Sequence, residues 1–103
     1  MDTSPTTSIE EYRMRDSSIS GATVILSGRY PDKGFAVNTK SHELVLVLSG
    51  TGVIGTKQKE TQIELGNCIL IRPNEKFYWR GHMAIFMACA PSWKAKQHKI
   101  GIK

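Results

Sequence analysis

Short apolar segments separated by polar turns follow one another through the chain from residue 23 to residue 89. In residues 61–65, apolar and polar side chains alternate, which is the pattern of a β-strand with one face in water. The breaks between segments, such as residues 49–52 and 65–67, carry glycine with serine, threonine or asparagine, which favour turns. Short strands at regular spacing with turns between them predict an all-β sandwich or barrel.

Two of the segments, residues 44–48 and 83–88, are apolar at every position. A strand of this kind has one face in the interior of a barrel and needs a cover on its other face. The cover can be a second sheet, the N-terminal segment or a second subunit. Because a large apolar patch would otherwise stay on the surface, we predict a homodimer.

The chain of 103 residues is long enough for one packed core, so we predict a single domain. We expect a flexible polar N-terminal segment at residues 1–20, a barrel at residues 21–93 and a basic tail at residues 94–103. The formal net charge is +5, but the cations are scattered outside the tail. Without an arginine-rich stripe, this charge predicts a basic surface and no specific nucleic-acid site.

The two cysteines, Cys68 and Cys89, each lie in an apolar segment, so we expect buried free thiols. No apolar run approaches the roughly 18 residues that a membrane span needs, and no apolar segment follows the N-terminus as a secretion signal does. We therefore expect a cytoplasmic protein with no membrane contact. A disulfide is not expected in that compartment.

Glycine and proline occur at two characteristic spacings, one around Glu43 and one further along the chain. Gly34 precedes Glu43, and Gly50 follows Glu43 after six residues. Further along, Gly66 is followed after six residues by Pro73. The chain resembles in this spacing the cupin superfamily, whose members fold as a double-stranded β-helix, or jelly-roll barrel. The resemblance covers roughly residues 23–90 and implies the same fold here.

The resemblance also implies where a metal would bind. In metal-binding cupins, two histidines of a His-x-His motif, the glutamate and a third histidine surround a divalent ion such as Fe, Mn, Ni or Zn. In this chain the His-x-His place falls within residues 37–40, and Tyr78 stands in the place of the third histidine. Glu43 is the one ligand of the set that is left. We therefore expect no tightly bound metal, with Glu43 as the remaining candidate ligand.

The resemblance places Asn38, Glu43 and Tyr78 around a shared lumen. A buried carboxylate needs partners, and we expect the Asn38 amide or the Tyr78 hydroxyl to bond to Glu43. Such a group is either a structural network or a ligand-binding site. Strand alternation places Phe77 and Trp79 on the face opposite Tyr78.

Residues 91–98 follow the last strand. They form either a simple basic tail or a lid that brings Trp93, Gln97 and His98 to the rim of the pocket. His98 is therefore a fourth candidate ligand-binding residue, beside Asn38, Glu43 and Tyr78.

Two functions follow from the resemblance. The first is a binding protein that holds a small polar organic molecule, a sugar or an organic acid, in its lumen without a tightly bound metal. The alternative is a cupin-type enzyme, an isomerase or epimerase, a lyase or a dioxygenase, with or without a divalent metal. Its catalytic candidates are Glu43 and Tyr78, since a carboxyl group raised in pKa by an apolar setting can act as acid or base.

Overall fold

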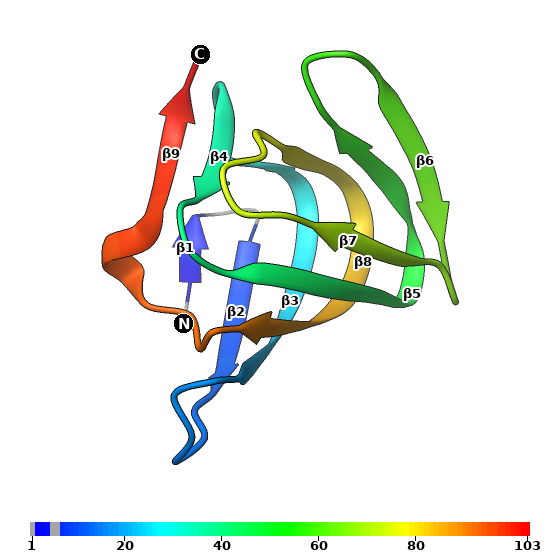
Figure 1. The fold of residues 1–103 in the computed structure, drawn as a ribbon. Helices are drawn as coiled ribbons and strands as arrows, with labels where there is room; N and C mark the ends of the chain where they lie inside the picture. Colours follow the sequence, from blue (N-terminus) through cyan, green and yellow to red (C-terminus); the bar gives the residue numbers. More distant parts are fainter. Residues whose placement is uncertain (1, 5–6) are drawn as a thin grey trace.

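A computed structural model describes residues 2–4 and 7–103, and strands make up most of this part of the chain (Figure 1). The elements are β1 (Asp2–Ser4), β2 (Thr7–Tyr12), β3 (Ser20–Tyr30), β4 (Phe35–Asn38), β5 (His42–Gly55), β6 (Glu60–Glu64), β7 (Cys68–Ile71), β8 (Tyr78–Ala90), the 3-10 turn η1 (Ala95–Gln97) and β9 (His98–Ile102). The prediction of an all-β barrel is confirmed. In the described ranges, no helix is long and apolar enough to cross a membrane.

Two long strands form the centre of the larger sheet, whose order is β1-β2-β3-β8-β5-β6. Strand β8 lies between β3 and β5 and pairs with both along almost its whole length. The free edge of β5 is shared, since its first half pairs with β7 and its second half with β6. A second, two-stranded sheet of β4 and β9 stands beside β1 and β2 in Figure 1.

A bulge in β5 decides which of its side chains face the interior. Its pairing with β8 shifts by one residue between Val47 and Ser49. Before the bulge, Glu43, Val45 and Val47 are buried, and after it Val53 and Ile54 are both buried, but Ile54 is the one that belongs to the core cluster. The inward positions therefore change from odd to even numbers, because a β-strand turns alternate side chains to opposite faces.

The N-terminal segment corrects one expectation. Residues 7–12 were expected to be part of a flexible leader, but they form β2, which pairs with β3 in unbroken register. Thr7 is buried, and Ile9 packs against the core. The backbone hydrogen bonds that β3 offers along its free edge order this segment. Met1, Pro5 and Thr6, which the same prediction covers, lie outside the described residues.

The C-terminal residues correct a second expectation. Residues 98–102 form β9 and pair with β4, where we expected a simple basic tail. The cysteines are both free, as the structure describes them, but only Cys89 is buried. Cys68 is exposed because it stands opposite Leu46, which points to the outside of β5.

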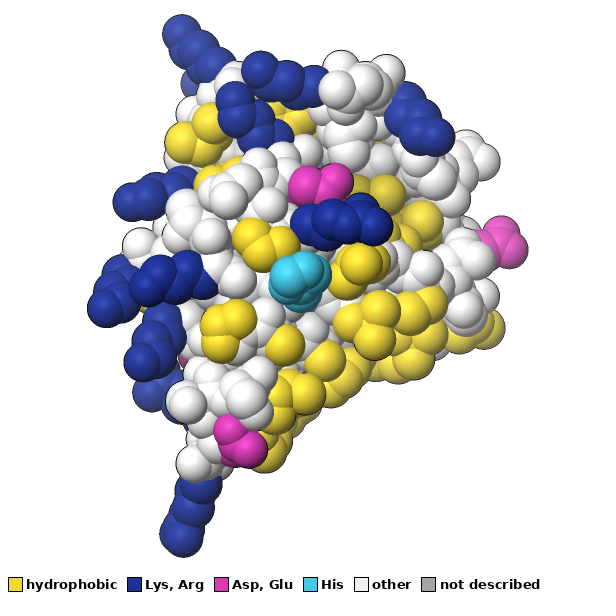
Figure 2. Space-filling model, viewed as in Figure 1, with side chains coloured by type: hydrophobic (Ala, Val, Ile, Leu, Met, Phe, Trp, Pro, Cys, Tyr) yellow, Lys and Arg dark blue, Asp and Glu magenta, His cyan; other side chains and the backbone are white. Residues whose placement is uncertain are grey.

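The outer face of the sheet keeps a row of apolar side chains in contact with solvent. Leu44, Leu46 and Leu48 on β5 are 52%, 40% and 43% exposed. Leu70 on β7 stands opposite Leu44 and is also exposed. Figure 2 shows hydrophobic side chains gathered on the side of the molecule where β5 and β7 run, with Lys and Arg mostly elsewhere. Because these leucines are exposed, neither the second sheet nor β2 covers this face of β5 as the sequence pattern allowed.

Candidate functional site

The barrel encloses a cavity of about 590 Å³. Its walls come from β2, β3, β5 and β8, and from the segment of residues 92–98 that leads into β9. Aromatic rings supply much of the wall: Tyr30, Phe77, Trp79 and Trp93. Among the polar groups of the wall are Glu43 and His98.

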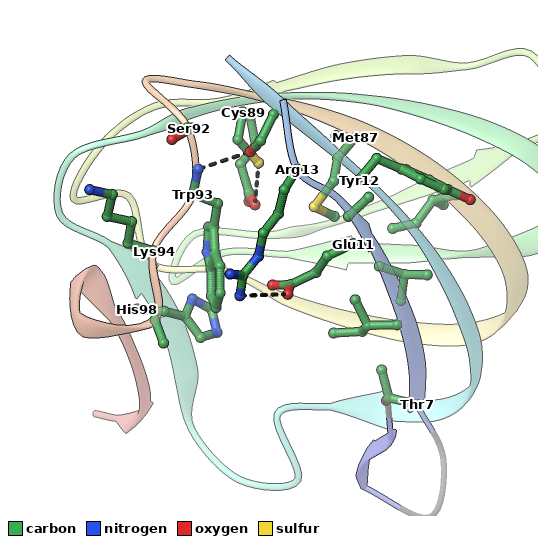
Figure 3. A pocket seen from close by; sticks show the side chains of 18 of the residues that line it. Thr7, Glu11, Tyr12, Arg13, Met87, Cys89, Ser92, Trp93, Lys94 and His98 are labelled. Carbon is green, nitrogen blue, oxygen red and sulfur yellow. Dashed lines mark hydrogen bonds and ion pairs between the residues drawn. The ribbon is translucent and has the colours of Figure 1, made fainter. Parts of the chain in front are cut away.

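Glu43 is the buried carboxyl group of this wall, with only 4% of its surface exposed. The thiol of Cys89 donates to its Oε2 atom, with Sγ and Oε2 3.5 Å apart, the bond drawn from Cys89 in Figure 3. Among the described residues, neither the Oε1 atom of Glu43 nor the Nδ2 atom of Asn38 has a partner that meets hydrogen-bond geometry, so the expected Asn38–Glu43 bond is not formed. Burial raises the pKa of Glu43 to about 7, while the Cys89 thiol and the nearby Asn38 amide act to lower it. The carboxyl group is therefore divided between its protonated and ionised forms near neutral pH.

Cys89 acts as a donor and not as a nucleophile. Burial raises the pKa of its thiol, and the negative charge of Glu43 raises it further. The sulfur therefore stays protonated at neutral pH, in contrast with the thiolate that catalytic cysteines need.

A chain of hydrogen bonds joins the C-terminal segment to β3 and β4. The Oδ1 atom of Asn38 lies 2.8 Å from Nδ1 of His98 and accepts a second bond from Nε1 of Trp93 at 3.2 Å. The Nε2 atom of His98 lies 2.7 Å from the hydroxyl oxygen of Tyr30. Trp93, His98 and Tyr30 line the cavity, while Asn38 supports them from behind. In Figure 3 the rings of Trp93 and His98 lie beside each other at the cavity wall.

Burial keeps this histidine uncharged. It lowers the pKa of His98 below its ordinary value of 6.5, so the ring is neutral at pH 7. Burial and the neighbouring charge of Glu43 raise the pKa of the Tyr30 hydroxyl. The polar wall of the cavity therefore carries little charge near neutral pH.

Gln97 holds the C-terminal segment in place. Its Oε1 atom accepts bonds from the backbone N–H groups of Lys40 and Ser41 at 2.7 and 2.8 Å. Its Nε2 atom donates to the hydroxyl of Ser41. Of the three residues expected at the rim, Trp93 and His98 line the cavity, and Gln97 is a buried anchor.

Arg13 and Lys94 lie among the lining residues toward solvent. The side chain of Arg13 is 89% exposed and forms an ion pair with Glu11, with Nη2 and Oε2 3.8 Å apart (Figure 3). Part of the positive charge at this place is therefore already neutralised.

The structure places Tyr78 outside the barrel, so the expectation that it shares the lumen is wrong. Its hydroxyl donates to Glu60, and the guanidinium of Arg29 lies 4.1 Å from the centre of its ring. Its neighbours Phe77 and Trp79 are each 3% exposed and line the cavity instead. Of the four predicted site residues, the structure brings together Asn38, Glu43 and His98, and not Tyr78.

No family profile matches the chain, and no curated protein matches it. Several solved structures have a similar fold. A histidine-to-glutamine variant of Streptomyces PAC13 with uridine superposes with a TM-score of 0.84 at 18% identity, over 95% of this chain and 80% of that one. Ectoine synthase from P. lautus gives 0.75 at 17% identity, over 96% and 78% of the two chains. The Clostridium difficile EutQ protein gives 0.72 at 14%, over 88% and 66%. The chain has the cupin fold.

The cupin motif explains why the prediction for Tyr78 failed. The family has five residues between the glycine and the proline of its second motif, and this chain has six between Gly66 and Pro73. The prediction of Tyr78 as the histidine position follows from counting forward from Pro73. Counting from Gly66 gives Phe77, which faces the lumen. The same count puts Asn74 at the position of the second cupin glycine, and Asn74 has a φ of 68°, a backbone conformation that glycine adopts readily.

The residues that stand at the cupin metal positions in this chain do not form a metal cage. The inward-facing residues of β4 are Ala36 and Asn38, and with Glu43 and Phe77 they occupy the four places. Ala36 and Phe77 have no donor atom, and an amide oxygen is a weak ligand for the transition metals. In the part of the chain that the structure describes, no three His, Cys, Asp or Glu residues lie together as a metal site requires. We derive no step through a metal.

Tyr30 is the site residue that sequence reasoning missed. It ends β3 directly before Pro31, so the sequence shows it as part of a turn. Its partner His98 is 68 positions away, and no motif joins them. The only signal is its aromatic side chain at the end of a strand, which is too common to single it out.

Proposed function

We propose that this cupin binds a small, uncharged organic molecule with a polar ring in its cavity. The observation that carries the proposal is a buried carboxyl group on the cavity wall, that of Glu43, whose Oε1 atom makes no hydrogen bond to the described residues, with the Asn38 amide, whose Nδ2 atom also lacks a partner, close enough to lower its pKa. A buried polar atom without a bond costs free energy, which a ligand hydroxyl or N–H group would recover. The volume of about 590 Å³ lies within the roughly 300–1,000 Å³ of small-molecule pockets.

The walls favour a ring-bearing ligand. Trp79, Phe77 and Trp93 offer flat apolar surfaces against which a sugar or a heterocyclic base can pack. A nucleoside combines both parts, and the structure of PAC13 with uridine shows that a related barrel holds one. Of the two ligand classes expected from the sequence, a sugar or sugar-like ring fits better than an organic acid. Glu43 has no cation bonded to it among the described residues, and its ionised form repels an anion.

Binding measurements on the full chain test the proposal. The panel contains uridine and other nucleosides, ribose and ribulose, and small organic acids, screened by thermal shift and confirmed by calorimetry. We expect one or more ring compounds to bind and Glu43→Gln to weaken that binding about tenfold, because a carboxyl group can either donate or accept at Oε1, whereas each atom of an amide group does only one of these. Glu64→Gln is the matched control, since Glu64 is exposed on β6. Equal affinity of both variants, or no binding by any compound, contradicts the proposal.

We propose that binding needs no tightly held metal, since the residues at the cupin metal positions supply too few donors. Metal analysis of protein purified without chelators tests this. Stoichiometric Fe, Mn, Ni or Zn would contradict it and favour a metalloenzyme.

The second candidate function is that of an enzyme. Glu43 and the Tyr30–His98 pair are titratable groups in one cavity with different pKa values, which is the arrangement that acid–base enzymes use. Pac13, a nucleoside dehydratase, and ectoine synthase have the same fold. An isomerase, epimerase or lyase therefore suits this cavity better than a dioxygenase, which relies on a metal.

We also propose that the chain forms a homodimer through the apolar outer face of β5 and β7. Leu44, Leu46 and Leu70 form a neutral surface there, so two copies can meet without bringing the net positive charge of the chains together. A cytoplasmic location stays a prediction, with which the free thiols of Cys68 and Cys89 are compatible.

A further inference from the structure

The hydrogen bonds of the polar wall fix the position of each proton in it. The indole N–H of Trp93 can only donate, so the Asn38 atom that it contacts is the carbonyl oxygen Oδ1. That oxygen can only accept, so Nδ1 of His98 carries a proton and donates to it. In the neutral ring, Nε2 then holds a lone pair and accepts from the hydroxyl of Tyr30.

This arrangement makes Tyr30 a proton acceptor toward the cavity. Its hydroxyl proton is directed to Nε2 of His98 over 2.7 Å, so the oxygen can take a proton from a ligand as it passes its own to the ring. Both side chains line the cavity. Asn38 is a positioning residue here, because its carbonyl holds the His98 ring in the tautomer that leaves Nε2 free.

Glu43 can act as a proton donor on the same cavity wall. It lines the same cavity and lies near enough to Tyr30 for its charge to affect that hydroxyl. The Cys89 thiol occupies Oε2, and Oε1 bonds to no described residue. The protonated carboxyl group can therefore donate to a ligand oxygen.

We propose that the cavity catalyses proton transfer on a bound carbonyl compound, with Tyr30 and His98 acting together as the base and Glu43 as the acid. The inference rests on the proposed binding function and adds the chemistry of the ligand, which is a carbonyl group with hydrogen on the adjacent carbon. A sugar that binds as its ring joins this class when the ring opens and frees the carbonyl group.

The step balances without a metal or an oxidant. The carbon-bound proton passes to the oxygen of Tyr30, whose own proton passes to Nε2 of His98. The electron pair of the broken C–H bond becomes the new C=C bond, and the carbonyl oxygen takes the proton of Glu43. The products are an enol, a protonated His98 and an ionised Glu43, whose opposite charges stabilise each other across the cavity. Return of a proton to the opposite face of the same carbon gives epimerisation. Where the adjacent carbon carries a hydroxyl group, the enol is an enediol, and return of the proton to the former carbonyl carbon, with loss of the proton of that hydroxyl group, gives isomerisation.

The first test concerns the proton positions in the hydrogen-bonded chain of Tyr30, His98 and Asn38, and it needs no ligand. ¹⁵N NMR of the full chain with labelled histidine reports which ring nitrogen of His98 carries the proton. We expect the Nδ1–H tautomer at pH 7, and we expect Asn38→Ala to lose this preference. A His98 ring protonated at Nε2 in the wild-type protein overturns the inference.

The second test concerns the chemistry. Ribose and ribulose are incubated with the protein in D₂O, and ¹H NMR follows the exchange of hydrogen next to the carbonyl. We expect exchange above the rate without protein, a loss of about 100-fold or more in Tyr30→Phe, and wild-type exchange in the control Tyr78→Phe. Tyr78 is a fair control because it lies outside the barrel.

The outcomes separate this inference from the binding function. Binding of either sugar without exchange, or full exchange by Tyr30→Phe, overturns proton transfer and leaves the binding function intact. Failure of every compound in the panel to bind removes both proposals.

Discussion

The thiol of Cys89 donates to the carboxyl group of Glu43 inside the barrel, with Sγ and Oε2 3.5 Å apart. The two side chains come from neighbouring strands, where Glu43 stands directly opposite Cys89 in the β5–β8 ladder. The charge of Glu43 raises the pKa of the Cys89 thiol, whereas the hydrogen bond from the thiol lowers the pKa of Glu43 against the larger effect of burial. The pair keeps this part of the wall polar without a permanent charge.

The stability of the protein should depend on the ionisation of Glu43. Its pKa rises from 4.5 to about 7 on folding, so the folded state holds a proton that the unfolded state releases. The contribution is complete below pH 4.5 and is lost as the pH rises to 7, by about 3 kcal/mol in the free energy of unfolding. Urea unfolding at several pH values should show this loss in the wild-type protein and not in Glu43→Gln. Glu64→Gln should keep the wild-type dependence, and the same pH profile in all three proteins would contradict the assignment.

Asn38→Ala should destabilise the fold. The substitution removes the oxygen atom that accepts from both His98 and Trp93. Each buried donor left without a partner costs about 1–3 kcal/mol, so we expect a loss of about 2–4 kcal/mol in denaturant unfolding. Asn67→Ala is the comparison, since Asn67 is exposed and accepts a single bond from the backbone of Glu64. A smaller loss of unfolding free energy for Asn38→Ala than for Asn67→Ala would contradict the inference that Asn38 holds His98 and Trp93 in place.

Gln97→Ala should loosen the C-terminal segment without unfolding the barrel. The amide groups of Lys40 and Ser41 donate to Gln97, so their hydrogen exchange should become faster in the variant. Binding of the panel compounds should weaken as well, because the segment carries Trp93. Gln58→Ala, in an exposed turn, should leave these two amides as protected as in the wild type. Unchanged exchange in Gln97→Ala would show that β9 alone holds the segment.

Leu44→Asp should convert the proposed dimer into a monomer. The side chain of Leu44 is 52% exposed in the single chain, and a charge there would be buried against the second copy without a partner. Sedimentation analysis should give the mass of two chains for the wild type and of one chain for the variant. Ile100→Asp is the control, because Ile100 is 56% exposed on β9, which belongs to the other sheet. A monomeric wild-type protein would refute the dimer.

Much of the fold could be predicted from local pattern alone. The spacing of apolar segments and turns predicted the all-β barrel, and the distance from Glu43 to Gly50 indicated its class. The prediction that residues 44–48 turn one face to the interior is confirmed, since Val45 and Val47 are buried while the leucines that alternate with them are exposed, and alternation depends on a single strand. Local pattern could not show that β2 and β9 are ordered, because their hydrogen-bond partners lie far away in the sequence.

The sequence by itself determined the strands between residues 23 and 89, their order along the chain and the carboxyl group at the start of β5. Only the tertiary structure decided which face of β8 looks inward, because the additional residue before Pro73 separates the two ways of counting the motif. It also brought Tyr30 to His98 and Asn38. These contacts join β3, β4 and β9, and such long-range neighbours depend on how the sheets close, which no local pattern of residues encodes.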